Sequence, residues 1–235
     1  QDRIREIAQR EWVRNFDERA GLSDAELLRY VDVEEKPAPF TEKLLSDKKE
    51  HIVKRENFDF EGYEAGGFKD EVPEHLYNYG EIYNLILEKG TLTHEERFKI
   101  NEHVIMSIKM LEQLPFPAHL TRIPEYAGTH HETLIGTGYP RRLTKDELSV
   151  PARIMAIADI FEALTASDRP YKKAKPVSEC LFILGTMVEK NHLDPDIIAV
   201  FIESGVYKNY ISEYANQEQL DDVDLNNLPG YKPLR

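Results

Sequence analysis

The segment ARIMAIADIFEAL, residues 152–164, decides the fold. Apolar side chains lie on nearly every face of a helix built from it, so other helices are expected to enclose it. The capping box from Thr144 to Glu147 precedes this segment, and the pair Arg169-Pro170 follows it. These signals predict a helix over about residues 150–165. A chain organised around such a helix is predicted to be all-α.

The same kinds of signal place further helices on both sides. A second capping box begins at Thr93 and predicts a helix that ends near Leu114. Pro124 suits the first turn of a helix that runs to His130 and His131. Downstream, two more helices are expected over 177–190 and 195–204, with Gly205 ending the second. The result is a predicted bundle of about five or six helices.

The N-terminal region is less regular. A helix is expected from Asp2 to Arg19, because apolar residues recur there at helical spacing, and a capping box at Ser23 predicts a short second helix. Residues 33–80 are charged and broken by proline and glycine, which favours short helices and loops. After Tyr210 the chain is acidic and is expected to be a weakly ordered arm. The sequence thus divides into an irregular helical region, 1–84, a bundle, 85–209, and an acidic tail, 210–235.

Composition limits the classes of partner. The formal net charge of −13 argues against broad binding to DNA, RNA or anionic membrane, because those partners need a positive field. No apolar run approaches the ~18 residues of a membrane span, so the chain is expected to be cytoplasmic. The single cysteine, Cys180, lies in an apolar stretch, and a packed thiol is expected there rather than a nucleophile.

Histidines and one aspartate could form a metal site. His130 and His131 are adjacent, and neutral imidazole is the commonest metal ligand; a pair of surface histidines at a helix end is the alternative. Asp159 lies in the middle of the apolar helix, where a buried carboxylate needs a metal or an ion pair. His103 is a third imidazole near an apolar helix face, which a core histidine would equally explain.

Basic residues gather in two places of this acidic chain. Arg169 and Lys172 belong to one group, with Lys173 and Lys175, and Arg141-Arg142 form the other. Arginine can bind a phosphate through two hydrogen bonds and lysine can bind it as a point charge. A solvated basic loop remains the alternative in each case.

Taken together, the order of these pieces resembles the HD-GYP family of helical, metal-dependent phosphodiesterases. The resemblance covers about residues 85–207 and rests on several motifs at family-like spacing. They are His103, His130-His131-Glu132, Gly136-Thr137-Gly138-Tyr139-Pro140, Asp159 and Arg169-Pro170-Tyr171-Lys172.

This resemblance implies an activity and a set of roles. Two or three iron or manganese ions would activate a hydroxide that attacks cyclic di-GMP. By resemblance, the metal ligands would be His103, His130, His131 and Asp159, while Arg169 and Lys172 would hold phosphate. Gly138 and Tyr139 would shape the mouth of the site and could contact partner proteins. Family members often serve as output domains of signalling proteins such as response regulators, which implies that context here.

The sequence departs from the family pattern at two points. The His-Asp dipeptide that gives the family its name does not occur: His75, for example, precedes Leu76. Ile135 stands where the family usually has an acidic residue. Three explanations stay open: a His-Asp pair upstream of Gln1, with residues 1–80 as an insertion; a degenerate cyclic-dinucleotide receptor or protein-interaction module; or a structural scaffold with inherited motifs.

Overall fold

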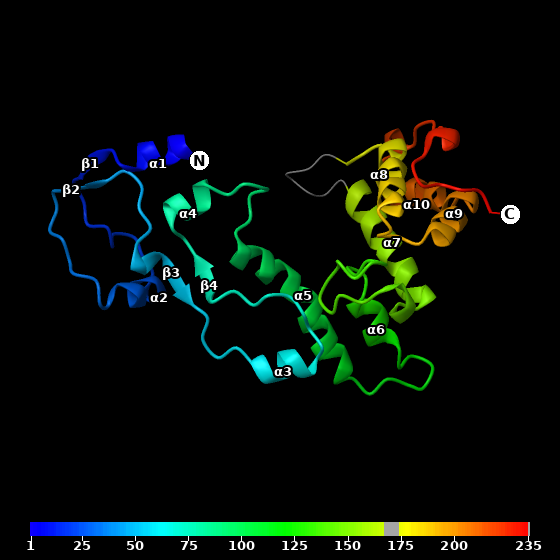
Figure 1. Cartoon of the computed structure of the whole chain (residues 1–235), viewed down its shortest axis with the longest axis horizontal. Helices are drawn as coiled ribbons and strands as arrows, with labels where there is room; N and C mark the ends of the chain where they lie inside the picture. The colour runs from blue at the N-terminus through cyan, green and yellow to red at the C-terminus, as the bar shows by residue number, and fades with distance from the viewer. Residues whose placement is uncertain (167–173, 235) are drawn as a thin grey trace. The chain divides into compact units, whose positions relative to one another are not determined.

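Helices dominate the computed structural model, which describes residues 1–166 and 174–234. The chain divides into two compact units: unit 1 contains residues 1–62 and 71–100, and unit 2 contains residues 63–70 and 101–235 (Figure 1). Within the described ranges, the strands form only two small antiparallel pairs. The expected helical fold is therefore confirmed.

Unit 1 carries both strand pairs. β1, Glu11–Arg14, pairs with β2, Phe40–Lys43, and β3, Ile52–Lys54, pairs with β4, His75–Asn78. The β3–β4 register is irregular between Val53 and Lys54. Short helical elements precede, separate or follow the strands: α1, Asp2–Ala8; α2, Asp24–Leu27; η1, Leu28–Tyr30; η2, Lys49–His51; and α4, Glu81–Leu85.

The predicted helix from Asp2 to Arg19 is wrong. α1 ends at Ala8, and the chain becomes extended at Glu11 to pair with β2. The Arg14 Nε atom donates to Glu42 Oε1 over 2.5 Å, and the Arg14 guanidinium lies 4.9 Å from the centre of the Trp12 ring. Strand pairing with a distant segment has therefore overridden the local helical spacing, as tertiary contacts often do. The predicted capping box at Ser23 is confirmed, since its N–H and hydroxyl both donate to Glu26.

Unit 2 contains the predicted bundle. α3, Phe60–Ala65, and α5, His94–Glu112, each begin in unit 1 and continue into unit 2. The remaining elements follow in chain order: α6, Ile123–Gly128; η3, Lys145–Glu147; α7, Val150–Thr165; α8, Val177–Glu189; α9, Pro195–Glu203; α10, Val206–Tyr214; η4, Gln217–Gln219; and η5, Leu225–Asn227.

The predicted capping signals stand at the starts of these helices. The Thr93 hydroxyl accepts from the Glu96 N–H while the Glu96 carboxylate accepts from the Thr93 N–H. The box at Thr144 is also formed, and Ser149 then caps α7. α6 ends at Gly128, before the two histidines that were expected to close it.

The core of unit 2 lies among α7, α8, α9 and α10, which Figure 1 shows side by side. Ile157, Leu184, Ile198 and Ile211 are almost fully buried there. Cys180 belongs to the same core, and burial raises the pKa of its thiol to about 11. The expectation of a packed, unreactive cysteine is confirmed.

The tail after Tyr210, expected to be a weakly ordered arm, contacts the rest of unit 2. The Gln219 side chain is buried and donates to the carbonyl oxygens of Thr165 and Lys175, each over 3.0 Å. Asp221 accepts from the Ser178 N–H at the start of α8. Leu228 packs against the core of unit 2. These apolar and hydrogen-bonded contacts outweigh the acidic composition that suggested a loose arm.

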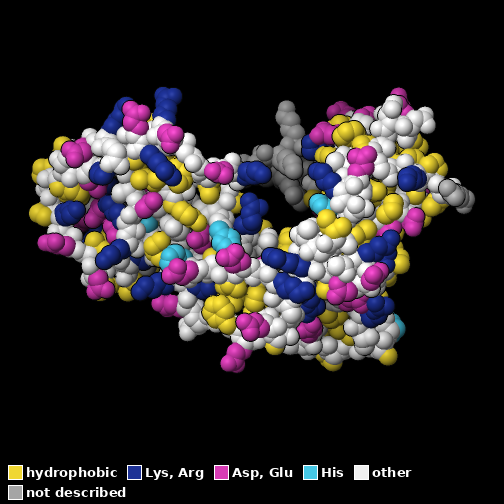
Figure 2. Space-filling view, viewed as in Figure 1, with side chains coloured by type: hydrophobic (Ala, Val, Ile, Leu, Met, Phe, Trp, Pro, Cys, Tyr) yellow, Lys and Arg dark blue, Asp and Glu magenta, His cyan; other side chains and the backbone are white. Residues whose placement is uncertain are grey.

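The surface mixes charges of both signs. On the face shown in Figure 2, acidic, basic and hydrophobic side chains are interspersed. Among the described helices, none is both long enough and apolar enough to cross a bilayer.

Candidate metal centre

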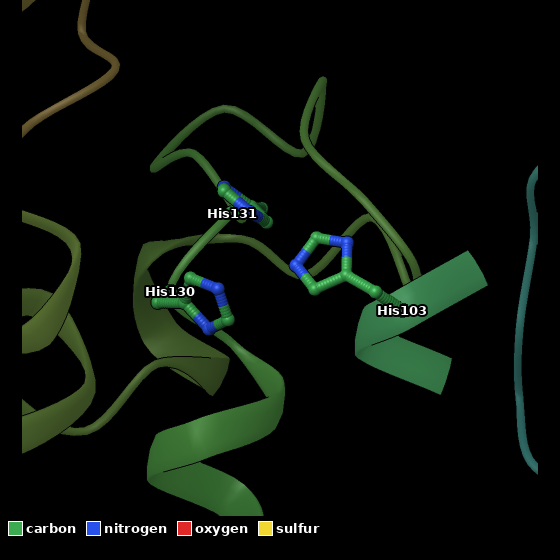
Figure 3. A group of neighbouring side chains, drawn as sticks. All are labelled: His103, His130 and His131. Atoms are coloured by element: carbon green, nitrogen blue, oxygen red, sulfur yellow. The ribbon is translucent and has the colours of Figure 1, made fainter. Parts of the chain in front are cut away.

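Three imidazoles meet in unit 2. His103 extends from α5 toward His130 and His131, which follow the end of α6 (Figure 3). One ring nitrogen from each histidine lies within 4.8 Å of the others. Two nitrogens bound to one ion at ~2.1 Å can be at most ~4.2 Å apart. Small side-chain rotations, or a pair of ions, would thus bring these three histidines, the imidazole cluster, into a coordination shell.

The end of α6 fixes the orientation of His130. Its Nδ1 atom lies 2.6 Å from the Ala127 carbonyl oxygen, so Nδ1 carries the proton and donates to that oxygen. The lone pair on Nε2 is then available for a metal. A backbone carbonyl that holds the second nitrogen of a histidine is a common support for metal ligands.

Asp159 lies beside this cluster but is not buried. Its side chain is 39% exposed, and its Oδ2 atom lies 4.0 Å from His131 Nδ1. That distance is too long for a hydrogen bond. The central position in α7 does not enclose the carboxylate because α7 has an exposed face, on which Met155, one turn before Asp159, also lies. The carboxylate therefore lies beside His131 and is partly exposed to solvent.

His131 is held in its neutral form. Burial lowers the pKa of its imidazole to about 4, with a further contribution from the neighbouring His130 that outweighs the effect of Asp159. Its ring stacks on Tyr139, with centroids 4.7 Å apart. Burial, together with the Asp159 and Asp70 carboxylates, raises the pKa of Tyr139 to about 12. At neutral pH this site therefore presents an unprotonated imidazole against a protonated phenol.

The glycine loop, residues 135–143, wraps around a buried carboxylate. Glu132 is 5% exposed and accepts from the backbone N–H groups of Arg141 and Leu143, over 2.7 and 3.0 Å. Burial raises the pKa of this carboxyl, although these hydrogen bonds act in the opposite direction. The end of the loop is therefore held against the residue that follows the histidine pair.

Gly138 is required where this loop passes the histidines. A Cβ atom at this position would lie 2.5 Å from both the His131 carbonyl oxygen and the Glu132 Cα atom. Both are backbone atoms that cannot move aside, so only glycine allows the approach. The Tyr139 N–H then donates to the His131 carbonyl oxygen over 3.2 Å, which sets the tyrosine ring against the imidazole.

The remaining predicted positions have different outcomes. Arg169 and Lys172 lie outside the described residues. Lys175 forms an ion pair with Glu179 one helical turn away. Ile135 is half exposed, and its backbone bridges to Thr144. This residue supports the loop through its main chain, not its side chain.

Sequence reasoning missed two polar residues near the glycine loop. Asp70 and Asn101 both line a cavity beside Tyr139, and the Asn101 amide donates to Asp70 Oδ2 over 3.3 Å. Neither residue belongs to a recognised motif, and Asp70 lies in the irregular segment 33–80, which is broken by proline and glycine. Only the fold brings them to the loop.

Comparisons with known proteins indicate the family. A family model described as HD domain matches residues 39–197. The chain is 40% identical over 122 residues to 3'3'-cGAMP-specific phosphodiesterase 3 of Vibrio cholerae, covering 50% of this chain and 25% of that protein. It is 34% identical over 147 residues to 3'3'-cGAMP-specific phosphodiesterase 1 of Vibrio cholerae, covering 59% of this chain and 33% of that protein.

A relative from another organism is named for a different substrate. The chain is 31% identical over 154 residues to a cyclic di-GMP phosphodiesterase of Thermotoga maritima, covering 64% of this chain and 40% of that protein. In all three comparisons, the chain matches well under half of the relative's length.

Proposed function

Because the chain belongs to the HD domain family, in its HD-GYP branch, we propose that it contributes to a metal-dependent phosphodiesterase that hydrolyses cyclic di-GMP. The observation that carries this proposal is the imidazole cluster beside Asp159. 3'3'-cGAMP is a second candidate substrate, because two similar relatives bear that substrate in their names. Both nucleotides contain the same type of phosphodiester and at least one guanine.

The donor set fits a divalent transition metal. Imidazole nitrogens suit iron and zinc, and a carboxylate extends the range to manganese. We assign His103, His130, His131 and Asp159 as ligands, with iron or manganese as the ions. When bound, such ions lower the pKa of a coordinated water and neutralise charge that develops on phosphorus.

The surrounding residues would prepare the site. The Ala127 carbonyl holds His130 with Nε2 presented, and the depressed pKa of His131 keeps that ring unprotonated at neutral pH. Tyr139 stays protonated, so its hydroxyl can donate to a substrate phosphate oxygen. We assign Gly138 and Tyr139 to the mouth of the site, and Arg169 and Lys172 to the phosphates.

A cyclic-dinucleotide receptor without turnover is the alternative function. One observation favours it: no histidine in these residues precedes an aspartate, so the family's His-Asp ligands are missing from this sequence. Three imidazoles and one carboxylate could then bind metal, or could bind nucleotide alone, without completing a hydrolytic site. Retention of the phosphate-binding Arg169 and Lys172 is expected of a receptor as well as of an enzyme.

The test measures metal and turnover together. Metal content per chain is determined by elemental analysis after loading with Mn²⁺ or Fe²⁺, and cyclic di-GMP and 3'3'-cGAMP are assayed for linear product. We expect His130→Ala to weaken metal binding by at least ~10-fold, because it removes a ligand rather than a supporting group. His119→Ala is the matched control, since His119 is an exposed loop histidine outside the cluster.

The two functions separate in this assay. Metal binding with turnover that His130→Ala abolishes supports the phosphodiesterase. Nucleotide binding with no turnover under any metal supports the receptor. A wild-type chain that binds neither metal nor nucleotide contradicts both. Arg169→Ala should weaken nucleotide binding and leave metal content nearly unchanged, and equal metal loss in Arg169→Ala and His130→Ala would refute the division of roles.

A further inference from the structure

A cavity of about 350 Å³ adjoins the glycine loop within unit 2. Asp70 and Arg142 both line it, together with Asn101, Tyr139 and the loop backbone at Gly136 and Gly138. Its volume lies at the lower end of the range for small-molecule sites, which suits one base better than a whole dinucleotide. Tyr139 also stacks on His131, so a single ring joins this cavity to the imidazole cluster.

The segment that carries Asp70 is fixed to the glycine loop. The Lys69 N–H donates to the Pro140 carbonyl oxygen over 2.8 Å, and the Tyr63 hydroxyl donates to the Asp70 carbonyl oxygen over 2.9 Å. Tyr63 is buried, which restrains this contact further. The backbone of Asp70 therefore has a defined position relative to the loop.

Arg141 reinforces that connection. Its Nε atom donates to the Gly66 carbonyl oxygen over 2.8 Å, and its guanidinium lies 5.2 Å from the centre of the Phe68 ring. The first arginine of the Arg141-Arg142 pair thus has a structural role. It binds residues 66–68 to the loop and does not line the cavity.

The second arginine is available to a ligand. Arg142 has a φ of 53°, an uncommon value for a residue with a side chain. The Glu132 carboxylate, which binds the N–H groups on both sides of it, holds this conformation. The exposed Arg142 side chain makes no hydrogen bond or ion pair with residues 1–166 or 174–234. Backbone strain of this kind often accompanies a functional position.

We infer that this cavity binds a guanine base of the substrate, with Asp70 and Arg142 as its specificity-determining residues. The inference rests on the proposed function. Guanine presents two adjacent N–H donors, N1 and N2, which match a carboxylate such as Asp70, and two acceptors, O6 and N7, which match a guanidinium such as Arg142. Adenine places an acceptor at N1, where it would face the carboxylate. The charges of the cavity therefore favour guanine over adenine.

The test uses nucleosides, because they carry no phosphate for a metal or a basic residue to bind. Binding of guanosine, inosine and adenosine to the full chain is measured by saturation-transfer NMR, alongside turnover of cyclic di-GMP. We expect guanosine to bind best and inosine, which lacks the 2-amino group, to bind more weakly. A lost two-hydrogen-bond base contact corresponds to a ~5- to 150-fold weaker affinity.

Two variants probe the cavity and one controls for charge. Asp70→Asn should weaken guanosine binding by that factor and leave adenosine binding equal or stronger, because an amide can pair with adenine. Arg142→Gln should weaken guanosine binding with metal content unchanged. Asp146→Asn, which removes an exposed carboxylate outside the cavity, should behave as wild type.

The outcomes distinguish this inference from the proposed function. Turnover of cyclic di-GMP with no preference for guanosine overturns the base site alone. A guanosine preference that Asp70→Asn abolishes, without any turnover, supports the base site and counts against the phosphodiesterase. Equal losses of guanosine and adenosine binding in Asp70→Asn would show a purely structural effect and would also overturn the inference.

Discussion

At the scale of single residues, Glu132 makes the hydrogen bonds that hold the glycine loop in place. It directly follows the two clustered histidines, and its buried carboxylate receives the backbone N–H groups of Arg141 and Leu143. The same residue thereby fixes the return of the glycine loop and the conformation of Arg142. Without the Glu132 carboxylate these N–H groups would be buried and unsatisfied, which costs free energy. This requirement explains why an acidic residue follows the two histidines.

We predict that Glu132→Gln lowers the free energy of unfolding by ~1–3 kcal/mol. Glutamine keeps one acceptor oxygen but places an NH₂ group against one of the two backbone donors, which leaves that donor unsatisfied in a buried position. Urea unfolding followed by circular dichroism measures the change. The exposed Glu189 provides a control with the same substitution, and an equal shift in the midpoint for Glu189→Gln would contradict the prediction.

At the scale of helices, Asp194 links three elements: α7, α9 and η3. Its Oδ1 atom accepts from the Asp196 N–H and caps α9, while its Oδ2 atom accepts from Arg153 on α7 over 2.6 Å. Lys145, in η3, lies 3.9 Å from the same oxygen. Burial acts to raise the pKa of Asp194, but the hydrogen bonds from Arg153 and Asp196 and the nearby cations outweigh it, and the pKa lies below its ordinary value.

This depressed pKa predicts a pH-dependent contribution to stability. The carboxylate is preferred in the folded state, so its contribution is complete above the unfolded-state pKa of ~3.9 and disappears as the pH falls through the lower folded-state pKa. Asp194→Asn should cost ~1.5–3 kcal/mol at neutral pH, the value of a hydrogen bond to a charged group. The difference from wild type should shrink at about pH 3.

Denaturant midpoints of both proteins at the two pH values test this linkage. Asp196→Asn, two residues further along the exposed part of α9, is the control and should show little change. A difference between wild type and Asp194→Asn that stays constant with pH would mean that the ion pair does not contribute through its charge.

The helices of unit 2 were predictable because their signals are local. Thr93 caps α5 as predicted, and α7 spans Val150–Thr165, as its apolar pattern indicated, although its cap is Ser149 and the predicted box at Thr144 caps η3. The β1–β2 pairing was not predictable, since Glu11 and Lys43 meet only through folding and residues 2–16 also have helical spacing. Local periodicity cannot weigh a partner that lies far away in the sequence.

The residues of the site also differ in whether local sequence signals could identify them. His103, His130, His131 and Asp159 were recognisable from residue type and motif order, and the fold brings them together. The exposure of Asp159 was not foreseen, because an apolar sequence does not specify which helix faces find partners. Asp70 was missed for a related reason: its proximity to Tyr139 depends on hydrogen bonds between segments separated by about 70 residues.

At the scale of the whole molecule, the acidic tail forms hydrogen bonds on both sides of the segment that contains Arg169 and Lys172. Thr165 ends α7 and Lys175 precedes α8, and residues 167–173, which include Arg169 and Lys172, connect them. The Gln219 amide donates to the carbonyl oxygens of both Thr165 and Lys175. A residue near the end of the chain therefore holds the two anchor points of the segment to which we assign phosphate binding.

We predict that Gln219→Ala lowers the free energy of unfolding by ~1–3 kcal/mol, because the buried Thr165 carbonyl and the half-buried Lys175 carbonyl each lose a hydrogen bond. If Arg169 and Lys172 bind phosphate, the variant should also weaken binding of cyclic di-GMP while its metal content stays at the wild-type level, since Gln219 does not contact the imidazole cluster. Urea unfolding, calorimetric nucleotide titration and elemental analysis report these three quantities separately. Gln217→Ala, an exposed substitution in the same turn, is the control. Loss of metal in parallel with nucleotide would contradict a role confined to the phosphate-binding segment, because it would show that the tail supports the entire site.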